Sequence, residues 1–216
     1  MEKGSVMRII IVRHGETAWN LEEVFRGRKD VPLNETGERQ VEKLGAALKG
    51  EEISVVYSSP LSRSMATSRA VAHARGVEIV QSPELVDISY GEWEGMSNKE
   101  VEERHPDVMR RWKQAPGEVK FPGGESLDEV RRRAVGFLED VLKRHRGQTV
   151  VLSTHRVVCK VLVLHCLGLD NSRFWNVRQE TAAYSVFDYE DSRFILVRHN
   201  EACHLKGIRD SFLSDF

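Results

Sequence analysis

The residues best suited to chemistry stand in one short run, Arg13-His14-Gly15-Glu16-Thr17, with Asn20 three residues further on. An imidazole can attack phosphorus as a neutral base, because its free nitrogen already carries a lone pair. An adjacent guanidinium can clamp phosphate oxygens and offset their charge. A bare Arg-His pair is usually only a polar strand end, but this one stands in a longer string. We therefore identify His14 as a candidate nucleophile and Arg13 as a candidate phosphate ligand.

Three β-type segments precede His14, Arg63 and His155 and would position them. An apolar, β-branched segment precedes His14, a second at residues 53–57 precedes Arg63, and a third at residues 148–153 precedes His155. Each is too short for a typical helix and predicts a strand. Parallel strands place their carboxyl ends on one sheet edge, where α/β proteins bind ligands. The pattern therefore predicts a pocket with two imidazoles and two arginines around one anion.

The remaining pattern alternates helices with strands. Six helices are predicted, along with a short strand and a hairpin. The helices run from the Asn34 cap to about Lys49, from Arg63 to about Arg75, after the capping boxes Ser97-x-x-Glu100 and Ser126-x-x-Glu129, from Pro106 to about Ala115, and over Val157–Leu167; the strand is Val77–Val80, and the hairpin joins Ala183–Asp188 to Phe194–Val197. This order predicts an α/β fold, a three-layer α/β/α sandwich whose mostly parallel central sheet has an antiparallel edge.

Composition sets broad limits on location and partners. The 216 residues fit one domain over 1–216, with a core at about 7–200 and a C-terminal tail at about 206–216. The net charge of −1 gives no reason to expect nucleic acid or an anionic membrane as a partner. No apolar run approaches a membrane span, the first residues do not form a signal peptide, and three cysteines without CxxC spacing fit a cytoplasmic protein. A homodimer is left open.

Four motifs in order resemble the histidine phosphatase superfamily, also called phosphoglycerate mutase-like. They are Arg13-His14-Gly15, Ser59-Pro60-Leu61-Ser62-Arg63, Asp87 ahead of Gly91-Glu92-Trp93-Glu94-Gly95, and Thr154-His155. The resemblance implies that His14 is the nucleophile and that Arg13, Asn20, Arg63 and His155 bind phosphate. It also implies that Asp87 is the general acid and that neither a metal nor another cofactor takes part.

Two positions depart from the family pattern. The acid is usually Glu, and Asp87 is one methylene shorter, so Glu84, Glu92 and Glu94 are rivals for its role. Arg156 stands where a Gly normally follows the second histidine. Its side chain either obstructs a backbone contact to phosphate or adds a cation for an acidic substrate.

Two other stretches have an ordinary interpretation. The basic loop at residues 25–30 is first interpreted as solvated, with an anion-attracting rim as the alternative. Arg198-His199 near the end of the chain echoes the first motif but lacks its Gly. We interpret it as a surface strand end, because a motif needs the right structural context.

The resemblance favours a phosphatase over a mutase, because the stretch between Met96 and Glu125 is short. Gly123-Gly124-Glu125-Ser126-Leu127 and Cys203-His204-Leu205 are similar to metal-independent phosphoserine phosphatases, which implies a specificity role for His204. Tyr90 replaces an expected carboxylate-binding His, so phosphoserine and α-ribazole phosphate both stay open. The predicted activity is hydrolysis of a small phosphorylated metabolite. The alternatives are a bisphosphoglycerate-dependent phosphoglycerate mutase and a non-catalytic phosphate-ligand-binding protein.

Overall fold

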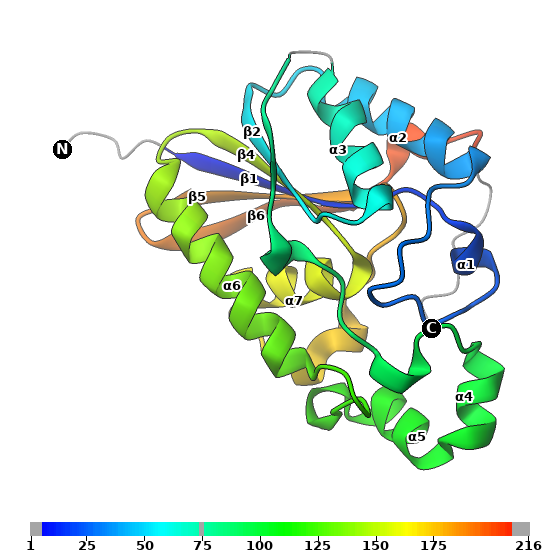
Figure 1. Cartoon of the computed structure of the whole chain (residues 1–216). Helices are drawn as coiled ribbons and strands as arrows, with labels where there is room; N and C mark the ends of the chain where they lie inside the picture. Colours follow the sequence, from blue (N-terminus) through cyan, green and yellow to red (C-terminus); the bar gives the residue numbers. More distant parts are fainter. Residues whose placement is uncertain (1–5, 74–75, 209–216) are drawn as a thin grey trace.

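A computed structural model describes residues 6–73 and 76–208 as a six-stranded sheet with helices on both faces (Figure 1). The strands are β1 (Met7–Arg13), β2 (Ile53–Ser58), β3 (Ile79–Gln81), β4 (Thr149–Thr154), β5 (Tyr184–Glu190) and β6 (Arg193–Glu201). The α-helices are α1 (Ala18–Leu21), α2 (Glu35–Ala47), α3 (Ser62–His73), α4 (Asn98–Arg104), α5 (Pro106–Gln114), α6 (Leu127–Arg144) and α7 (Arg156–Cys166). Short 3₁₀ turns are η1 (Pro83–Leu85), η2 (Gly91–Trp93), η3 (Pro116–Glu118), η4 (Asn171–Asn176) and η5 (Cys203–Leu205).

The sheet has the order β3-β2-β4-β1-β5-β6, so β1 lies near its centre. β1, β2, β3 and β4 pair in parallel, whereas β5 is antiparallel to both β1 and β6. Asp191 and Ser192 join β5 to β6 with φ of 47° and 61°, the left-handed backbone of a tight two-residue hairpin turn. The predicted three-layer fold, with its mostly parallel sheet and antiparallel edge, is confirmed.

Alternation along β1 distributes its side chains to the two faces of the sheet. Ile9 and Ile11 belong to the hydrophobic cluster on the side of α6 and α7, and Ile10 and Val12 belong to the cluster on the side of α2 and α3. All four are completely buried. A strand covered by helices on both faces needs apolar residues at every position, which explains the continuous apolar run in the sequence.

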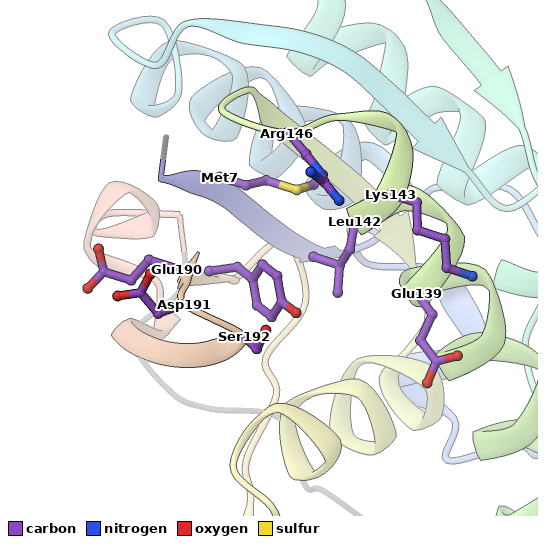
Figure 2. A pocket seen from close by; sticks show the side chains of 9 residues that line it. Met7, Glu139, Leu142, Lys143, Arg146, Glu190, Asp191 and Ser192 are labelled. Carbon is purple, nitrogen blue, oxygen red and sulfur yellow. The ribbon is translucent and has the colours of Figure 1, made fainter. Parts of the chain in front are cut away.

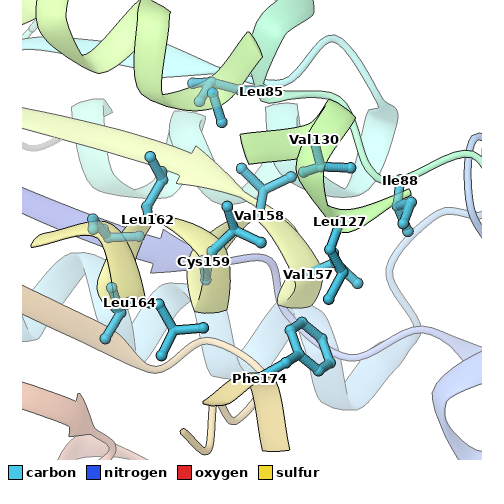
Figure 3. Packing of buried hydrophobic residues seen from close by; sticks show 14 of the residues in the cluster. Leu85, Ile88, Leu127, Val130, Val157, Val158, Cys159, Leu162, Leu164 and Phe174 are labelled. Carbon is cyan, nitrogen blue, oxygen red and sulfur yellow. The ribbon is translucent and has the colours of Figure 1, made fainter. Parts of the chain in front are cut away.

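The larger core also fixes the segment that carries Asp87. Leu85 and Ile88 are completely buried and belong to the cluster that includes Val130 of α6 and Val158 of α7 (Figure 3). Asp87 therefore lies between two anchored apolar side chains, although its segment is neither helix nor strand.

The predicted boundaries differ from the observed ones by a few residues. β3 begins two residues later than predicted, and α2 ends at Ala47 instead of Lys49. The predicted end of the helix near Arg75 and most of the C-terminal tail lie outside the described residues. Both capping boxes are confirmed at the starts of α4 and α6. Within the described residues, no helix is long and apolar enough to cross a membrane.

Candidate active site

The end of β1 fixes His14 between two neighbouring strands. The backbone N–H of His14 donates to the carbonyl of Thr154 at 3.0 Å, and its carbonyl accepts from the N–H of Ala182 at 3.0 Å. Gly15 then passes directly beside α2, where an added Cβ would lie 2.7 Å from the carbonyl oxygen of Gly37. Glycine is therefore required immediately after His14 for steric reasons.

The His14 ring is oriented as a nucleophile. Its Nδ1–H donates to the carbonyl of Gly15 at 2.6 Å, which leaves the lone pair on Nε2. Nε2 is buried and has no hydrogen-bond partner among the described residues. Burial first, and then the charges of Arg63 and Arg13, lower the pKa of His14 well below its usual value. The imidazole is therefore neutral at neutral pH.

His155 follows β4 and faces His14, with ring centroids 5.2 Å apart. Its Nδ1 accepts the Nε–H of Arg63 at 3.2 Å, so its Nε2–H donates to the hydroxyl of Ser59 at 2.7 Å. Burial, followed by the charge of Arg63, lowers the pKa of His155. The structure therefore brings both imidazoles and Arg63 together at this sheet edge, as the strand pattern predicts.

Arg63 joins the basic loop to the site. Its guanidinium donates to the carbonyls of Lys29 at 2.8 Å and Gly27 at 2.9 Å, and to Asp87 Oδ2 at 3.4 Å. Gly27 has a φ of 50°, the left-handed backbone conformation that glycine adopts without strain. Residues 25–27 of the loop are therefore buried beside the arginine, whereas residues 28–30 are exposed.

Asp87 lies within reach of the same groups, with Oδ2 3.8 Å from Nδ1 of His155. Its segment is held by Arg133 of α6, which donates to the carbonyls of Glu84, Val86 and Asp87 at 2.6, 2.8 and 3.2 Å. Arg133 also pairs with Glu125 at 3.0 Å. A side chain from a regular helix thus fixes the backbone around the candidate acid.

The rival carboxylates are placed differently. Glu84 and Glu92 are exposed to solvent. Glu94 accepts the backbone N–H groups of Arg28 and Tyr90, each at 3.1 Å, and so ties two loops together. Of the four carboxylates considered, Asp87 is the one recorded in contact with Arg63 and His155.

Arg26 is the site residue that the sequence interpretation underrated. The solvated-loop interpretation suits Arg28 and Lys29, which are exposed, but it is wrong for Arg26, which is only 7% exposed. Its Nε and Nη1 are buried without a hydrogen-bond partner among the described residues. Burial, followed by the charges of Arg13 and Arg63, lowers the pKa of Arg26 to about 9. The available signal was Phe25, an aromatic residue beside it that pulls this part of the loop into the core.

Of the other predicted site residues, Arg13 and Asn20 make hydrogen bonds near the end of β1, and Tyr90 and Arg156 line a cavity. Arg13 is buried and donates to the carbonyl of Gln179, and Asn20 Oδ1 accepts from the backbone and hydroxyl of Thr17, both at 2.9 Å. Tyr90 and Arg156 line a cavity with Arg26 and Asp87. His204 is not among the residues that line it.

The two remaining histidines of interest lie off this cavity. His204 is within hydrogen-bond distance of the carbonyl of Ala182 at 3.1 Å, and the N–H of Ala182 donates to the carbonyl of His14. His199 is on the edge strand β6, where Nδ1 is 3.0 Å from the hydroxyl of Ser185. Its exposure confirms the interpretation of Arg198-His199 as a surface feature.

A separate surface hollow lies at the start of β1, at the opposite end of this strand from His14 (Figure 2). Met7 and Leu142 line it together with side chains of both charges, among them Glu139 and Lys143. It contains no imidazole, and its mixed charge does not favour a phosphate. Among the described residues, no cluster of three or more histidine, cysteine or carboxylate side chains could hold a metal ion.

Comparison with known proteins agrees with this geometry. A family profile described as histidine phosphatase superfamily (branch 1) matches residues 9–202. The chain is 40% identical over 200 residues to phosphoserine phosphatase 1 of Hydrogenobacter thermophilus, covering 93% of this chain and 95% of that protein. It is 29% identical to the metal-independent phosphoserine phosphatase of Arabidopsis thaliana, covering 95% and 86%. Among solved structures, YhfR of Bacillus stearothermophilus is similar, with a TM-score of 0.88, 28% identity and coverage of 93% and 100%.

Proposed function

The chain belongs to branch 1 of the histidine phosphatase superfamily and is a phosphoric monoester hydrolase, and from that premise we propose that it works through a phosphohistidine on His14. The observation that carries the proposal is the state of the His14 ring. Nδ1 is engaged by Gly15, and Nε2 is buried, unprotonated and without a hydrogen-bond partner in the part of the chain that the structure describes. The proposed substrate is a small phosphorylated metabolite.

In the first step, His14 Nε2 forms a bond to phosphorus as the bond to the ester oxygen breaks. Arg13 and Arg63 offset the charge on the phosphate oxygens, and Asn20 and His155 complete the phosphate site. The leaving alkoxide takes a proton from the carboxyl group of Asp87. The products of this step are the alcohol and phosphohistidine.

In the second step, water attacks the phosphohistidine and the bond between phosphorus and Nε2 breaks. The Asp87 carboxylate removes the proton from water and is restored to its acid form. Inorganic phosphate leaves, and His14 regains its lone pair. The neutral state of His14 supports both steps, because a protonated imidazole has no lone pair for phosphorus.

The reaction needs only groups of this chain and water, so we propose that it is independent of metal ions. The name of the Arabidopsis relative supports this reading. We also propose a cytoplasmic location, because Cys159, Cys166 and Cys203 are free thiols, as expected in a reducing compartment.

The test is free-phosphate release in the presence of EDTA, with p-nitrophenyl phosphate, phosphoserine, 3-phosphoglycerate and α-ribazole phosphate as substrates. His14→Ala should abolish release, and the matched control His199→Ala should retain it. Acid-labile phosphate should appear on the wild-type protein and not on His14→Ala. Turnover that depends on bisphosphoglycerate without phosphate release would instead support a mutase. Binding of the esters without any turnover would support the non-catalytic alternative.

Asp87→Asn separates the acid from the nucleophile. The variant should lose about 10²-fold or more in kcat with an alkyl phosphate, whose leaving group needs a proton. It should lose much less with p-nitrophenyl phosphate, whose phenolate leaves unaided. Equal losses on both esters would exclude Asp87 as the proton donor.

A further inference from the structure

The carboxyl group of Asp87 depends on its backbone for its position. Oδ1 accepts the backbone N–H of Ile88 at 3.0 Å, but Oδ2 lies 3.4 Å from the Arg63 guanidinium and 3.8 Å from Nδ1 of His155. Strong hydrogen bonds from cations to carboxylates are shorter, at about 2.7–2.9 Å. The aspartate side chain is also short, so it cannot compensate for a displaced backbone. Whatever fixes this backbone therefore fixes the carboxyl group.

Arg133 of α6 holds that backbone with all of its donors. A guanidinium has five N–H donors, and each of them has an acceptor here. Nη1 donates to the carbonyls of Glu84 and Val86 at 2.6 and 2.8 Å, and Nη2 donates to the carbonyl of Asp87 at 3.2 Å. Nε and Nη2 also donate to the two carboxylate oxygens of Glu125 at 3.0 and 3.1 Å. The planar guanidinium is therefore confined to one orientation.

Glu125 holds the same segment at Ser89. Its Oε2 accepts the backbone N–H of Ser89 at 2.9 Å, and its own backbone N–H donates to the carbonyl of Ser89 at 2.8 Å. The two oxygens of this carboxylate form a bidentate pair with Arg133, the strongest geometry for such a contact. The segment is thus held before and after Asp87 by two side chains that are bonded to each other.

Stability alone does not explain this arrangement. Leu85 and Ile88 are completely buried in the larger core and already anchor the segment by apolar contact. The side chains of Arg133 and Glu125 are 18% and 17% exposed, and the loss of hydration in such a pair offsets much of its Coulomb energy. The pair contributes direction instead, because a planar fork accepts only one arrangement of the surrounding carbonyls.

We propose that Arg133 and Glu125 are positioning residues for proton transfer, and that they set the place of the Asp87 carboxyl group through the backbone of residues 84–89. The inference rests on the proposed function, in which Asp87 gives its proton to the leaving alkoxide and later takes one from water. Neither positioning residue is among those that line the cavity with Asp87. A displacement of about 1 Å lowers a rate by about 10²-fold, so contacts to the backbone are sufficient to control this step.

The experiment compares two esters. The first is the alkyl phosphate that the wild-type protein hydrolyses fastest, and the second is p-nitrophenyl phosphate, which needs no proton on its leaving group. Arg133→Met removes the fork, and Arg133→Lys keeps the charge without the geometry. Both variants should lower kcat at least about tenfold with the alkyl phosphate and less than about threefold with p-nitrophenyl phosphate. Glu125→Gln should show the same selectivity with a smaller loss.

A double variant separates positioning from a general loss of structure. In the Asp87→Asn background, Arg133→Met should change kcat with the alkyl phosphate by less than about twofold, because no acid is left to position. Arg133→Lys takes its place if Arg133→Met does not fold, as judged by circular dichroism. The matched control is Arg131→Met. Arg131 is also part of α6 and donates to a backbone carbonyl, that of Leu169 at 2.8 Å, and its loss should affect both esters less than about twofold.

The outcomes distinguish this inference from the proposed function. Equal losses on both esters in the Arg133 variants, with a selective loss in Asp87→Asn, would overturn the positioning role and leave the proposed reaction standing. Equal losses on both esters in Asp87→Asn would reject Asp87 as the acid, and the inference with it. A selective loss in Arg133→Lys that persists in the Asp87→Asn background would overturn the assignment of the pair to Asp87. A wild-type protein that releases no phosphate from any ester would reject both proposals.

Discussion

The chain contains almost the same four residues twice, at Ile11-Val12-Arg13-His14 and at Leu196-Val197-Arg198-His199. The first is the end of β1 near the centre of the sheet, and the second is part of the edge strand β6. Ile11 and Val12 are completely buried, whereas Leu196 and Val197 are 38% and 45% exposed.

The two histidines differ because their surroundings differ. His14 is buried and lies within the field of Arg13, Arg26 and Arg63, and its Nε2 has no hydrogen-bond partner within residues 6–73 and 76–208. His199 contacts a serine hydroxyl on a strand with one neighbour. The local sequence therefore does not determine the chemistry. Position in the sheet does, because only a central strand brings other strand ends and their arginines around the same ring.

The largest expected difference is in the activity of variants at Arg13 and Arg198. Arg13→Ala should lower kcat/KM by about 10³-fold, because it removes a preorganised cation from the phosphate oxygens. Arg198→Ala, on the exposed strand, should change kcat/KM less than about twofold. Steady-state kinetics on variants with wild-type circular dichroism provide the measurement. Similar losses in both would contradict the assignment of function to β1 alone.

The apolar residues before each pair should differ in their effect on stability. Ile11→Ala leaves a cavity in the larger core and should lower the free energy of unfolding by about 3 kcal/mol. Leu196→Ala, at a partly exposed position, should lower it by less than about 1 kcal/mol. Urea denaturation of both variants measures the two values, and a larger loss at Leu196 would indicate that β6 is covered in solution.

The residue after each histidine provides a finer test. Gly15→Ala introduces a Cβ 2.7 Å from the carbonyl oxygen of Gly37 and 2.9 Å from Val41, and should destabilise the protein by about 2 kcal/mol. Asn200 also has a φ of 50°, but its Oδ1 accepts the backbone N–H of Glu180 at 2.7 Å, so Asn200→Gly should lower the free energy of unfolding by about 1 kcal/mol. Thermal denaturation of the two variants compares them, and a neutral Gly15→Ala would contradict the close approach of α2.

The smallest expected difference is in pH dependence. The lowered pKa of His14 means that the unfolded chain gains a proton near pH 6.5 that the folded chain does not bind. The free energy of unfolding must therefore fall as pH drops below 6.5. His14→Gln should remove about 1 kcal/mol of this fall between pH 7 and 5.5. His199→Gln should remove less, because His199 is more exposed. Equal slopes for wild type and His14→Gln, from urea denaturation, would contradict a buried neutral ring.

The parts of the fold that were predictable are those with strong local patterns. The buried run of β1, the two capping boxes and the turn between β5 and β6 are specified by residues close in sequence. The sequence placed the start of β3 two residues too early, because its three residues are at most partly buried and show only a weak alternation of apolar and polar side chains. The one-turn helix α1 was missed because its four residues are too few to show a helical period.

The sequence predicted those residues of the candidate site that follow the ends of strands. Those ends brought His14, Arg63 and His155 together, as expected from a parallel sheet. Arg26 could not be placed in the same way, because a basic loop gives no sign of which cation turns inward. Burial of Phe25 and the carbonyl contact of Gly27 with Arg63 decide that, and both depend on distant segments.

The contacts of Arg133 have a consequence for how this protein can change during evolution. Arg133 holds the Asp87 segment by the carbonyl oxygens of Glu84, Val86 and Asp87. Every amino acid has such a carbonyl, so substitutions in this segment leave these hydrogen bonds available. A descendant of this chain can therefore replace Tyr90, which lines the same cavity, while the proposed acid Asp87 stays in register with the proposed nucleophile His14.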